Sequence, residues 1–330
     1  MKLNPKATCG WSMAEAIATI GGTSNFIRCK TKLTRFSGQY LMPVDSKEQE
    51  RLDIMHTMIL AARPKPQRLH HAPYTERIGP ERREPPRVLD LGHGTAMWLI
   101  DMQQKYQSTE FHGLDMAHMA PRELPPNIDL YPDIDYESPW ALGENSFDLI
   151  HLQMGLGSVG NWPLLYQKIY NHLKPGAWFE HVEVDWEPRC DDHTLLPGKL
   201  QDWWHRYVRD PYNVVGRSLT FNPRTAQLLE QKGFANVNHA AYRIPMHGWS
   251  SLHTERVAGT WWEHAMASGE GRGHGFEALS LAVLTRVQQW PAEHARKLCE
   301  EAMLEASNPA IHAYNTLHIY WAQRPPNAPR

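Results

Sequence analysis

A glycine-containing turn carries the strongest chemical signal in this sequence. Asp90, Gly92 and Gly94 come at the end of an apolar run over residues 87–91, and a helical pattern follows them. The two glycines let the backbone turn tightly and pass close to a ligand at the start of a helix. Asp115 lies 23 residues after Gly92, at the end of the next predicted strand, where a carboxylate can accept hydrogen bonds from both ribose hydroxyls. The pattern predicts a site for a nucleotide-containing cofactor, either a dinucleotide or S-adenosylmethionine.

The spacing of the glycines favours one of these two cofactors. The nicotinamide fingerprint G-x-G-x-x-G would place a third glycine where this chain has Met97. Residues 90–94 resemble instead the first motif of class I S-adenosylmethionine-dependent methyltransferases. The resemblance implies that this segment contacts the amino-acid part of the cofactor through Asp90, Gly92, His93 and Gly94.

Further residues at the ends of predicted strands complete the predicted cofactor site. Met116 follows the second strand, and Asp133 and Asp135 follow the third. Asp133 or Asp135 could accept a hydrogen bond from the adenine amino group, and either could equally be an ordinary turn residue. Gln153 and Met154 follow the fourth strand, and we expect them to line the cofactor or acceptor pocket.

The residues for a catalytic step are less well defined. Methyl transfer from a sulfonium requires alignment and exclusion of water, and it needs a base only when the acceptor is a weak nucleophile. His151 lies on the predicted strand 147–152 and is a weak candidate for such a base, with a buried structural histidine as the alternative. Glu180, His181 and Glu183 alternate along a later strand, so Glu180 faces the opposite side of the sheet from the other two.

The elements that must position these residues alternate between strand and helix. Strands are predicted at residues 87–91, 110–115, 128–131, 147–152, 177–184, 237–244 and 314–322, and helices at 46–62, 95–106, 162–173, 199–209 and 223–232. Alternation at this spacing implies right-handed crossovers and a mainly parallel sheet that is covered on both faces. We therefore expect an α/β, Rossmann-like, doubly wound fold with a seven-stranded, mostly parallel sheet.

Composition divides the chain into an arm and one domain. Residues 1–40 contain six basic residues against the single Glu15, a local charge of +5, and are expected to form a flexible arm. Residues 41–330 are expected to form a single domain, in which the proline-rich stretch 63–87 is a loop and residues 246–310 are a helical insertion.

Charge and composition also exclude several classes of protein. Lys+Arg 34 against Asp+Glu 36 gives a formal net charge of −2, so we expect no direct sequence-specific binding of nucleic acid. The four cysteines form no CxxC pair and the 19 histidines show no metal-ligand spacing, so we expect no metal and a reducing compartment. Long apolar runs are absent from the sequence, which argues against a signal peptide or a membrane span.

Long segments outside the glycine turn resemble one protein family. They are DYESPWALGENSFDLIHLQMG at 135–155, LKPGAWFEHVE at 173–183, EPRCDD at 187–192 and IHAYNTLHIY at 311–320. Together with the helix opening ERLD at 50–53, they are similar to the fungal LaeA family over about residues 36–325.

The LaeA resemblance implies several properties that the residues alone do not. It implies a class I methyltransferase fold with one reversed strand and S-adenosylmethionine as the cofactor. It also implies complexes with velvet-family proteins that control secondary metabolism and development, in the nucleus as well as the cytoplasm.

The chain departs from the family pattern at the glycine turn. The family usually reads Gly-Cys-Gly-Thr-Gly, where this chain has Gly-His-Gly-Thr-Ala at residues 92–96. His93 adds bulk, and Ala96 adds a methyl group where the backbone approaches the cofactor. The N-terminal arm is also shorter than in LaeA itself, which favours a paralogue.

Three hypotheses therefore stay open at the level of sequence. The chain could be a methyltransferase that regulates through protein partners, or a tailoring enzyme that methylates a small secondary metabolite. It could also be a non-catalytic scaffold with a degenerate cofactor motif. The fold alone does not decide among them, because one fold supports many functions.

Overall fold

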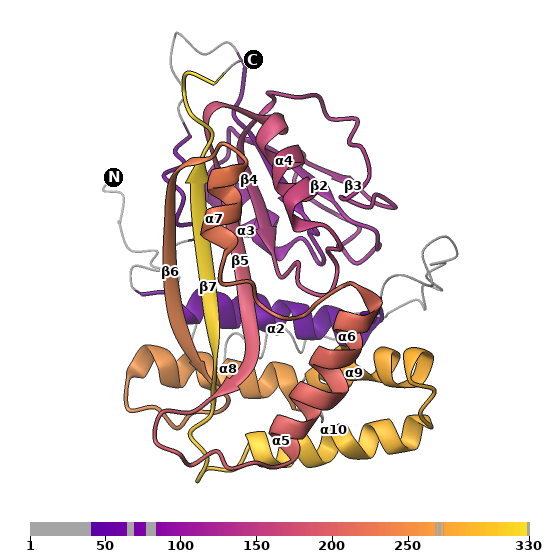
Figure 1. Cartoon of the computed structure of the whole chain (residues 1–330). Helices are drawn as coiled ribbons and strands as arrows, with labels where there is room; N and C mark the ends of the chain where they lie inside the picture. Colours follow the sequence, from indigo (N-terminus) through magenta and orange to yellow (C-terminus); the bar gives the residue numbers. More distant parts are fainter. Residues whose placement is uncertain are drawn as a thin grey trace, which may run out of the picture. The chain divides into compact units, whose positions relative to one another are not determined.

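Seven strands in the described part of the chain form one mixed sheet. The computed structural model describes residues 41–64, 69–76, 84–267, 269, 272 and 274–328, and the predicted arm at 1–40 lies outside them. The strands are β1 (Arg87–Leu91), β2 (Glu110–Leu114), β3 (Ile128–Tyr131), β4 (Phe147–Gln153), β5 (Leu173–Arg189), β6 (Ala235–Pro245) and β7 (Tyr314–Gln323). Their order across the sheet is β3-β2-β1-β4-β5-β7-β6 (Figure 1).

The strand directions confirm the predicted doubly wound fold. β1 pairs in parallel with β2 and β4, β2 pairs in parallel with β3, and β4 pairs in parallel with β5. β7 runs antiparallel to both β5 and β6, so it is the reversed strand that the family resemblance implied. β5 is longer than predicted because its residues continue to pair with β7 as far as Arg189.

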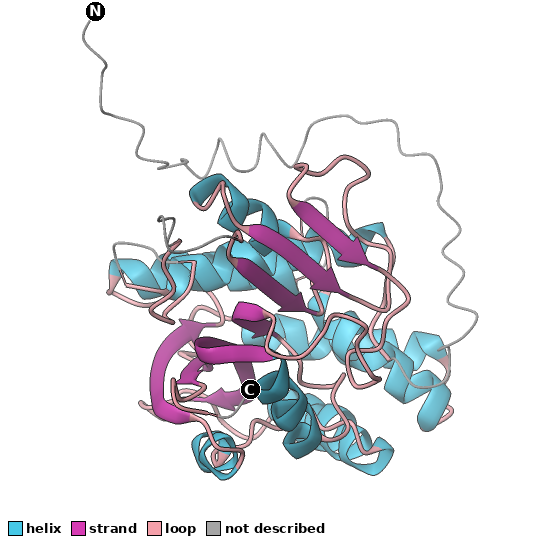
Figure 2. Ribbon diagram, turned by 90° about the horizontal axis from the view of Figure 1, so that it is seen from above, coloured by secondary structure: helices cyan, strands magenta, loops and turns pink. Residues whose placement is uncertain are grey.

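Helices lie on both sides of the strands, as Figure 2 shows. They are α2 (Ser46–Ala62), α3 (Met97–Lys105), α4 (Trp162–His172), α5 (Lys199–Asp202), α6 (Asp210–Val215), α7 (Thr225–Gln231), α8 (His253–Met266), α9 (Gly275–Ala282) and α10 (Ala292–Ala306). Two π-helical segments, η1 (Trp203–Arg209) and η2 (Val283–Val287), continue α5 and α9.

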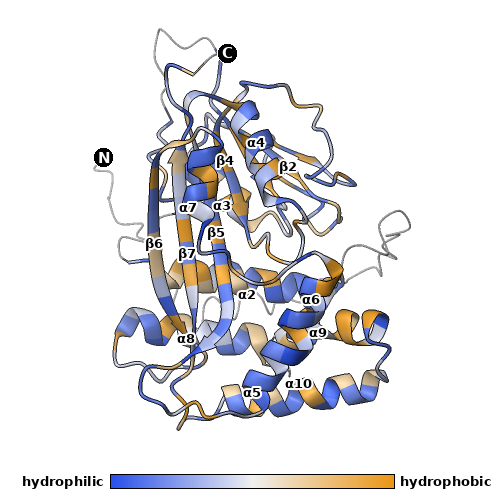
Figure 3. Ribbon diagram, in the orientation of Figure 1, coloured by the Kyte–Doolittle hydropathy of each residue, from blue (hydrophilic) through white to orange (hydrophobic). Residues whose placement is uncertain are grey.

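The helices between β6 and β7 pack against the start of the described chain. α8 packs against α2, and α10 packs against α9 and α5. Figure 3 shows hydrophobic and hydrophilic residues interspersed along α8 and α10, which is typical of helices with one buried face. The aromatic pairs Trp203–Trp204 and Trp261–Trp262 are buried core residues, so they do not form an exposed partner surface.

α2 begins where the sequence predicts. Asp45 is the N-cap, and its Oδ1 accepts a 3.0 Å hydrogen bond from the backbone N–H of Glu48. The Glu48 carboxylate accepts two 2.7 Å hydrogen bonds from the Arg51 guanidinium instead of returning to the cap. Met55 and Ile59 of α2 are buried.

α3 begins later than predicted, at Met97 instead of residue 95. Ala96 has φ 63° and ψ 14°, a left-handed conformation that cannot continue a right-handed helix. The predicted helix over 199–209 is α5 followed by the π-helical η1.

Some predictions concern residues that the structure does not describe. Residues 65–68 and 77–83 of the proline-rich stretch lie outside the described residues, as do positions 268, 270, 271 and 273 of the glycine-rich interruption. The division into an arm and one domain stays a prediction. Among the described helices, none combines the length and apolar character needed to cross a membrane.

Gly113 on β2 has no room for a side chain. A Cβ atom there would lie 2.7 Å from Leu130 Cδ2, 2.8 Å from His93 Cδ2 and 3.0 Å from Leu99 Cδ1. Gly113→Ala is expected to lower the free energy of unfolding by about 1–3 kcal/mol, because close-packed neighbours must shift. Urea denaturation measures this loss. Gly160→Ala, whose Cβ would approach no atom closer than 3.6 Å, is the matched control, and an equal loss in both variants would contradict the prediction.

Candidate functional site

Three buried polar residues lie side by side on neighbouring strands. Asp90 of β1 pairs in register with His151 of β4, which pairs with Glu180 of β5. Paired residues on adjacent strands face the same side of a sheet, so the three side chains share one face. His151 Nδ1 lies 2.9 Å from Asp90 Oδ1. Glu180 accepts hydrogen bonds from the backbone N–H groups of His71 and Ala72.

A cavity of about 60 Å³ lies beside this row of residues. Its walls come from α2, the glycine turn, α3 and the end of β4, and they consist of Leu52, His56, Asp90, Gly92, His93, Gly94, Thr95, Met97, Trp98, His151, Gln153 and Met154. Six of the predicted cofactor residues and the candidate base His151 are among them. The carboxyl edge of the parallel strands therefore gathers these residues as predicted.

Hydrogen bonds hold the glycine turn against the end of β2. Gly92 and Gly94 have φ values of 71° and 54°, in the left-handed region that favours glycine. The Gly92 N–H donates to the Leu114 carbonyl at 2.8 Å, and the Gly94 N–H donates to Asp115 Oδ2 at 2.8 Å. Asp115 thus braces the turn that lines the cavity.

The two departures from the family pattern are accommodated. Ala96 also has a left-handed backbone, but its methyl group is buried in an apolar cluster with Trp98 and Leu99 and does not line the cavity. The His93 ring packs beside Gly113, where the absence of a Cβ leaves space for it. His93 lines the cavity, whereas Ala96 does not.

Burial determines the protonation states of Asp90 and His151. Burial raises the pKa of Asp90 to about 8, and burial lowers the pKa of His151 to about 3. The raised pKa favours a protonated carboxyl, which donates a hydrogen bond to His151 Nδ1 and leaves the ring hydrogen on Nε2. The imidazole stacks on Trp98 with the ring centroids 3.8 Å apart, so its orientation is fixed.

Four buried polar atoms of the cavity walls have no hydrogen-bond partner within the described chain. They are His56 Nδ1, His93 Nε2, His151 Nε2 and Gln153 Oε1. Buried polar atoms normally find a partner in protein, water or ligand. These atoms provide both donors and acceptors, and so they fit the amino-acid part of S-adenosylmethionine, which carries a carboxylate and an ammonium group.

A buried glutamate holds the loop that follows β4. Met154 has φ 58°, and the N–H of the next residue, Gly155, donates to Glu183 Oε1 at 2.7 Å. His181 Nε2 lies 2.9 Å from the same oxygen. His181 and Glu183 therefore share one face of β5, while Glu180 lies on the other, as the alternation predicted.

Four predicted cofactor residues are not part of the cavity wall, namely Asp115, Met116, Asp133 and Asp135. Asp133 is largely exposed, and its carboxylate lies 3.1 Å from His118 Nε2. Asp135 Oδ1 accepts a 2.8 Å hydrogen bond from the backbone N–H of Glu137. The ribose and adenine contacts of these residues stay predictions.

Sequence reasoning missed the wall residues from α2 and α3. Leu52 and His56 are one helical turn apart on α2, and His56 Nε2 lies 3.0 Å from Asp101 Oδ2 of α3. The spacing of these two residues was visible in the sequence, but no local pattern places α2 over β1 and β4. Within the described residues, no group of three His, Cys, Asp or Glu is arranged to hold a metal ion.

The doubly wound sheet, the glycine turn and this cavity together define a class I S-adenosylmethionine-dependent methyltransferase. A family model described as a methyltransferase domain matches residues 66–239. Secondary metabolism regulator LAE1 of Cochliobolus heterostrophus is 42% identical over 290 residues, which cover 87% of this chain and 91% of the relative. Protein-methionine methyltransferase laeA of Emericella nidulans is 40% identical over 289 residues, which cover 87% of this chain and 73% of the relative. The chain belongs to the LaeA family of secondary metabolism regulators with a methyltransferase domain.

Solved methyltransferase structures resemble the fold more distantly. Phosphoethanolamine N-methyltransferase 2 of Haemonchus contortus, in complex with phosphomonomethylethanolamine and S-adenosylhomocysteine, gives a TM-score of 0.43 at 13% identity, covering 88% of this chain and 55% of that one. A putative methyltransferase of an antibiotic biosynthesis pathway from Anabaena variabilis gives a TM-score of 0.44 at 12% identity. The match covers 82% of this chain and 98% of that one.

S-adenosylmethionine is the cofactor of this domain, and when bound it supplies an activated methyl group on a sulfonium. The glycine turn, with Asp90, His93, Gln153 and Met154 around it, would hold the cofactor. His56 and Trp98 line the cavity on the side of the helices.

Ala96→Gly tests whether the departure at this position is neutral. The free energy of unfolding is expected to change by less than about 1 kcal/mol, because relief of left-handed strain offsets the loss of a buried methyl group. Affinity for S-adenosylhomocysteine is expected to stay within about twofold of the wild type, because Ala96 does not line the cavity. Urea denaturation and calorimetry measure the two effects. A gain in affinity of about tenfold would show that the methyl group obstructs the cofactor.

Asp90→Asn tests the protonation of the buried pair. Between the ordinary histidine pKa of 6.5 and the Asp90 pKa of about 8, folded Asp90 holds a proton that the unfolded chain has released. Stability of the wild type therefore falls as the pH rises through this window, by about 2 kcal/mol in all. Below pH 6.5, the lowered pKa of His151 acts in the opposite direction.

The amide group introduced by Asp90→Asn can still donate to His151 Nδ1, so the variant is expected to fold and to lose this decline in stability. Urea denaturation at pH 6.5, 7 and 8 gives the comparison. Asp129→Asn, at an exposed position of β3, should retain the wild-type slope. A slope that is unchanged in Asp90→Asn would refute the assignment of the proton.

Proposed function

We propose that this chain transfers the methyl group of S-adenosylmethionine to the thioether sulfur of a protein methionine, and regulates secondary metabolism and development in this way. The observation that carries the proposal is that His151, the candidate base in the cavity wall, is fully buried and has its Nδ1 2.9 Å from Asp90 Oδ1. The printed name of the Emericella nidulans relative, a protein-methionine methyltransferase, supports the same acceptor.

A thioether differs from other methyl acceptors because it loses no proton when it is methylated. Amines and hydroxyl groups must release a proton, and their methylation benefits from a base whose pKa lies near the working pH. Burial lowers the pKa of His151 to about 3, and Asp90 occupies its Nδ1. Such an imidazole is a weak base, so His151 gives little help to an acceptor that must release a proton.

The proposal extends to protein partners and location. We propose that the chain acts together with velvet-family proteins, in the nucleus and the cytoplasm. This part of the proposal rests on what the resemblance to the LaeA family implies. Affinity purification from the native fungus, followed by mass spectrometry, tests it, and recovery of no velvet-family or transcription-linked protein would count against it.

Labelled methyl transfer tests the acceptor. Purified chain is incubated with a fungal protein extract and S-adenosylmethionine carrying an isotope-labelled methyl group, and the labelled residue is identified by mass spectrometry of peptides. We expect the label on methionine sulfur. Label on lysine or arginine, or in a small metabolite, would contradict the proposal, and the last outcome would favour a tailoring enzyme.

Two variants control this experiment. Asp115→Ala removes the carboxylate that braces Gly94 and is expected to reduce labelling by about tenfold or more through weaker cofactor binding. Arg224→Gln, at an exposed position outside the cavity, is expected to label as the wild type does.

A further inference from the structure

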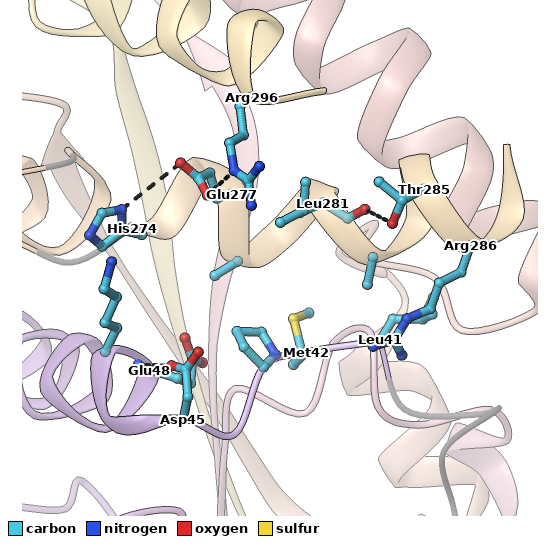
Figure 4. Close-up of a pocket in the computed structure, with 14 residues that line it drawn as sticks. Leu41, Met42, Asp45, Glu48, His274, Glu277, Leu281, Thr285, Arg286 and Arg296 are labelled. Atoms are coloured by element: carbon cyan, nitrogen blue, oxygen red, sulfur yellow. Dashed lines mark hydrogen bonds and ion pairs between the residues drawn. The ribbon is translucent and has the colours of Figure 1, made fainter. Parts of the chain in front are cut away.

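A second cavity has a volume of about 390 Å³. It lies one helical turn along α2 from the cavity beside the glycine turn, which we call the cofactor cavity. Its size falls within the range of small-molecule sites, roughly 300–1,000 Å³. One wall is the chain from Leu41 to Glu48, and the opposite wall is α9 and η2, with Arg296 of α10 above them (Figure 4). Leu52, one turn after Glu48, lines the cofactor cavity.

Much of the lining of this second cavity is apolar. The apolar lining residues are Leu41, Met42, Pro43, Ala278, Leu281 and Ala282. Met42 also packs toward the β4 loop, since a Cβ atom on Gly157 would lie 2.9 Å from Met42 Cε. The cavity therefore offers a surface for the hydrophobic body of a ligand.

The acidic residues of this lining already have partners. Asp45 accepts the backbone N–H of Glu48, and the Glu48 carboxylate is held by Arg51 through two 2.7 Å hydrogen bonds. Glu277 lies 3.6 Å from Arg296 Nε, as the dashed line in Figure 4 marks. These carboxylates are therefore poorly placed to attract a cation.

Two basic residues of the lining have no ion pair within the described chain. Lys47 belongs to α2 and Arg286 to η2, and both are exposed. Figure 4 shows Arg286 extending from η2 toward Leu41 across the opening. At the N-terminus of α2, the exposed Asp45 carboxylate offsets the positive end of the helix dipole. The cavity thus combines an apolar floor with unpaired positive charge at its rim.

The wall that carries Arg286 is itself unusual. η2 is π-helical, and Thr285 and Arg286 of this segment line the cavity. π-Helical turns are rare and occur frequently at functional sites, because the extra residue changes the direction of the side chains. The backbone of η2 therefore supports a binding role for this wall.

We propose that this cavity binds a small organic anion with an apolar body, such as an aromatic carboxylate, at a site separate from the cofactor cavity. The apolar part of the lining would hold the body, and the positive charges of Lys47 and Arg286 on the two walls would attract the anionic group. The proposal goes beyond methyl transfer and does not depend on the identity of the methyl acceptor.

Calorimetry with the full chain tests the proposal, using 2-naphthoate as the probe and 2-naphthamide as its neutral isostere. We expect 2-naphthoate to bind the wild type at least about tenfold more tightly than 2-naphthamide. The double variant Lys47→Gln, Arg286→Gln is expected to lose this difference, and Arg224→Gln to retain it. S-adenosylhomocysteine binding, measured on each variant, reports that the cofactor site is intact.

A cavity-filling variant gives a second measurement. Ala282→Phe places a ring against the apolar lining and is expected to weaken the binding of 2-naphthoate by about tenfold or more. If this variant fails to fold, the double variant Lys47→Gln, Arg286→Gln still tests whether the cavity binds the anion. The proposal is overturned if the wild type binds neither probe, if it binds both equally, or if the double variant binds 2-naphthoate as tightly as the wild type.

Discussion

Two buried carboxylates on β5 bind the two segments that border the cofactor cavity, α2 and the loop after β4, to the sheet. On one face, Glu180 accepts backbone hydrogen bonds from residues 71–72 and lies 3.4 Å from Arg63 at the end of α2. On the other face, Glu183 accepts the N–H of Gly155 in the loop after β4. A buried charge is tolerated when several donors satisfy it, and removal of those donors is costly. The position of α2 and of the β4 loop, and hence the shape of the cavity, depends on these two side chains.

Neighbouring carboxyl groups on the same face of the sheet are held in opposite protonation states. Burial alone would raise the pKa of Glu180, but the Arg63 guanidinium and the backbone hydrogen bond from Ala72 help to outweigh it and lower that pKa. Asp90 lies two strands away without such a cation, so burial keeps it protonated at neutral pH. The charged carboxylate therefore has a structural role, while the wall of the cofactor cavity presents a neutral Asp90–His151 pair. A neutral wall suits transfer of a methyl group to an acceptor that loses no proton.

Three of the seven non-glycine residues with positive φ values in the described chain lie where strands end at this edge of the sheet. Ala96, Asp133 and Met154 all have positive φ values, and they follow β1, β3 and β4. Such conformations cost of order 1–3 kcal/mol each for residues other than glycine, and they persist where surrounding contacts hold them. The Met154 N–H donates to the Val182 carbonyl at 2.8 Å, and the Ala96 N–H donates to the His93 carbonyl at 2.8 Å. Hydrogen bonds within the fold thus maintain the tight turns that bring the backbone to the cavity.

The sequence by itself determined the seven strands, the start of α2 and the glycine turn, because alternation, capping and the freedom of glycine are local properties. It also determined that Gln153 and Met154 lie near the glycine turn, because parallel strands end at a common edge. Only the tertiary structure decided that Asp90 meets His151 and that their pKa values move in opposite directions, because strand register and desolvation depend on residues far away in the chain. It also decided that α2 covers the cavity through His56, since an amphipathic pattern shows which face of a helix is buried and not which part of the sheet it meets.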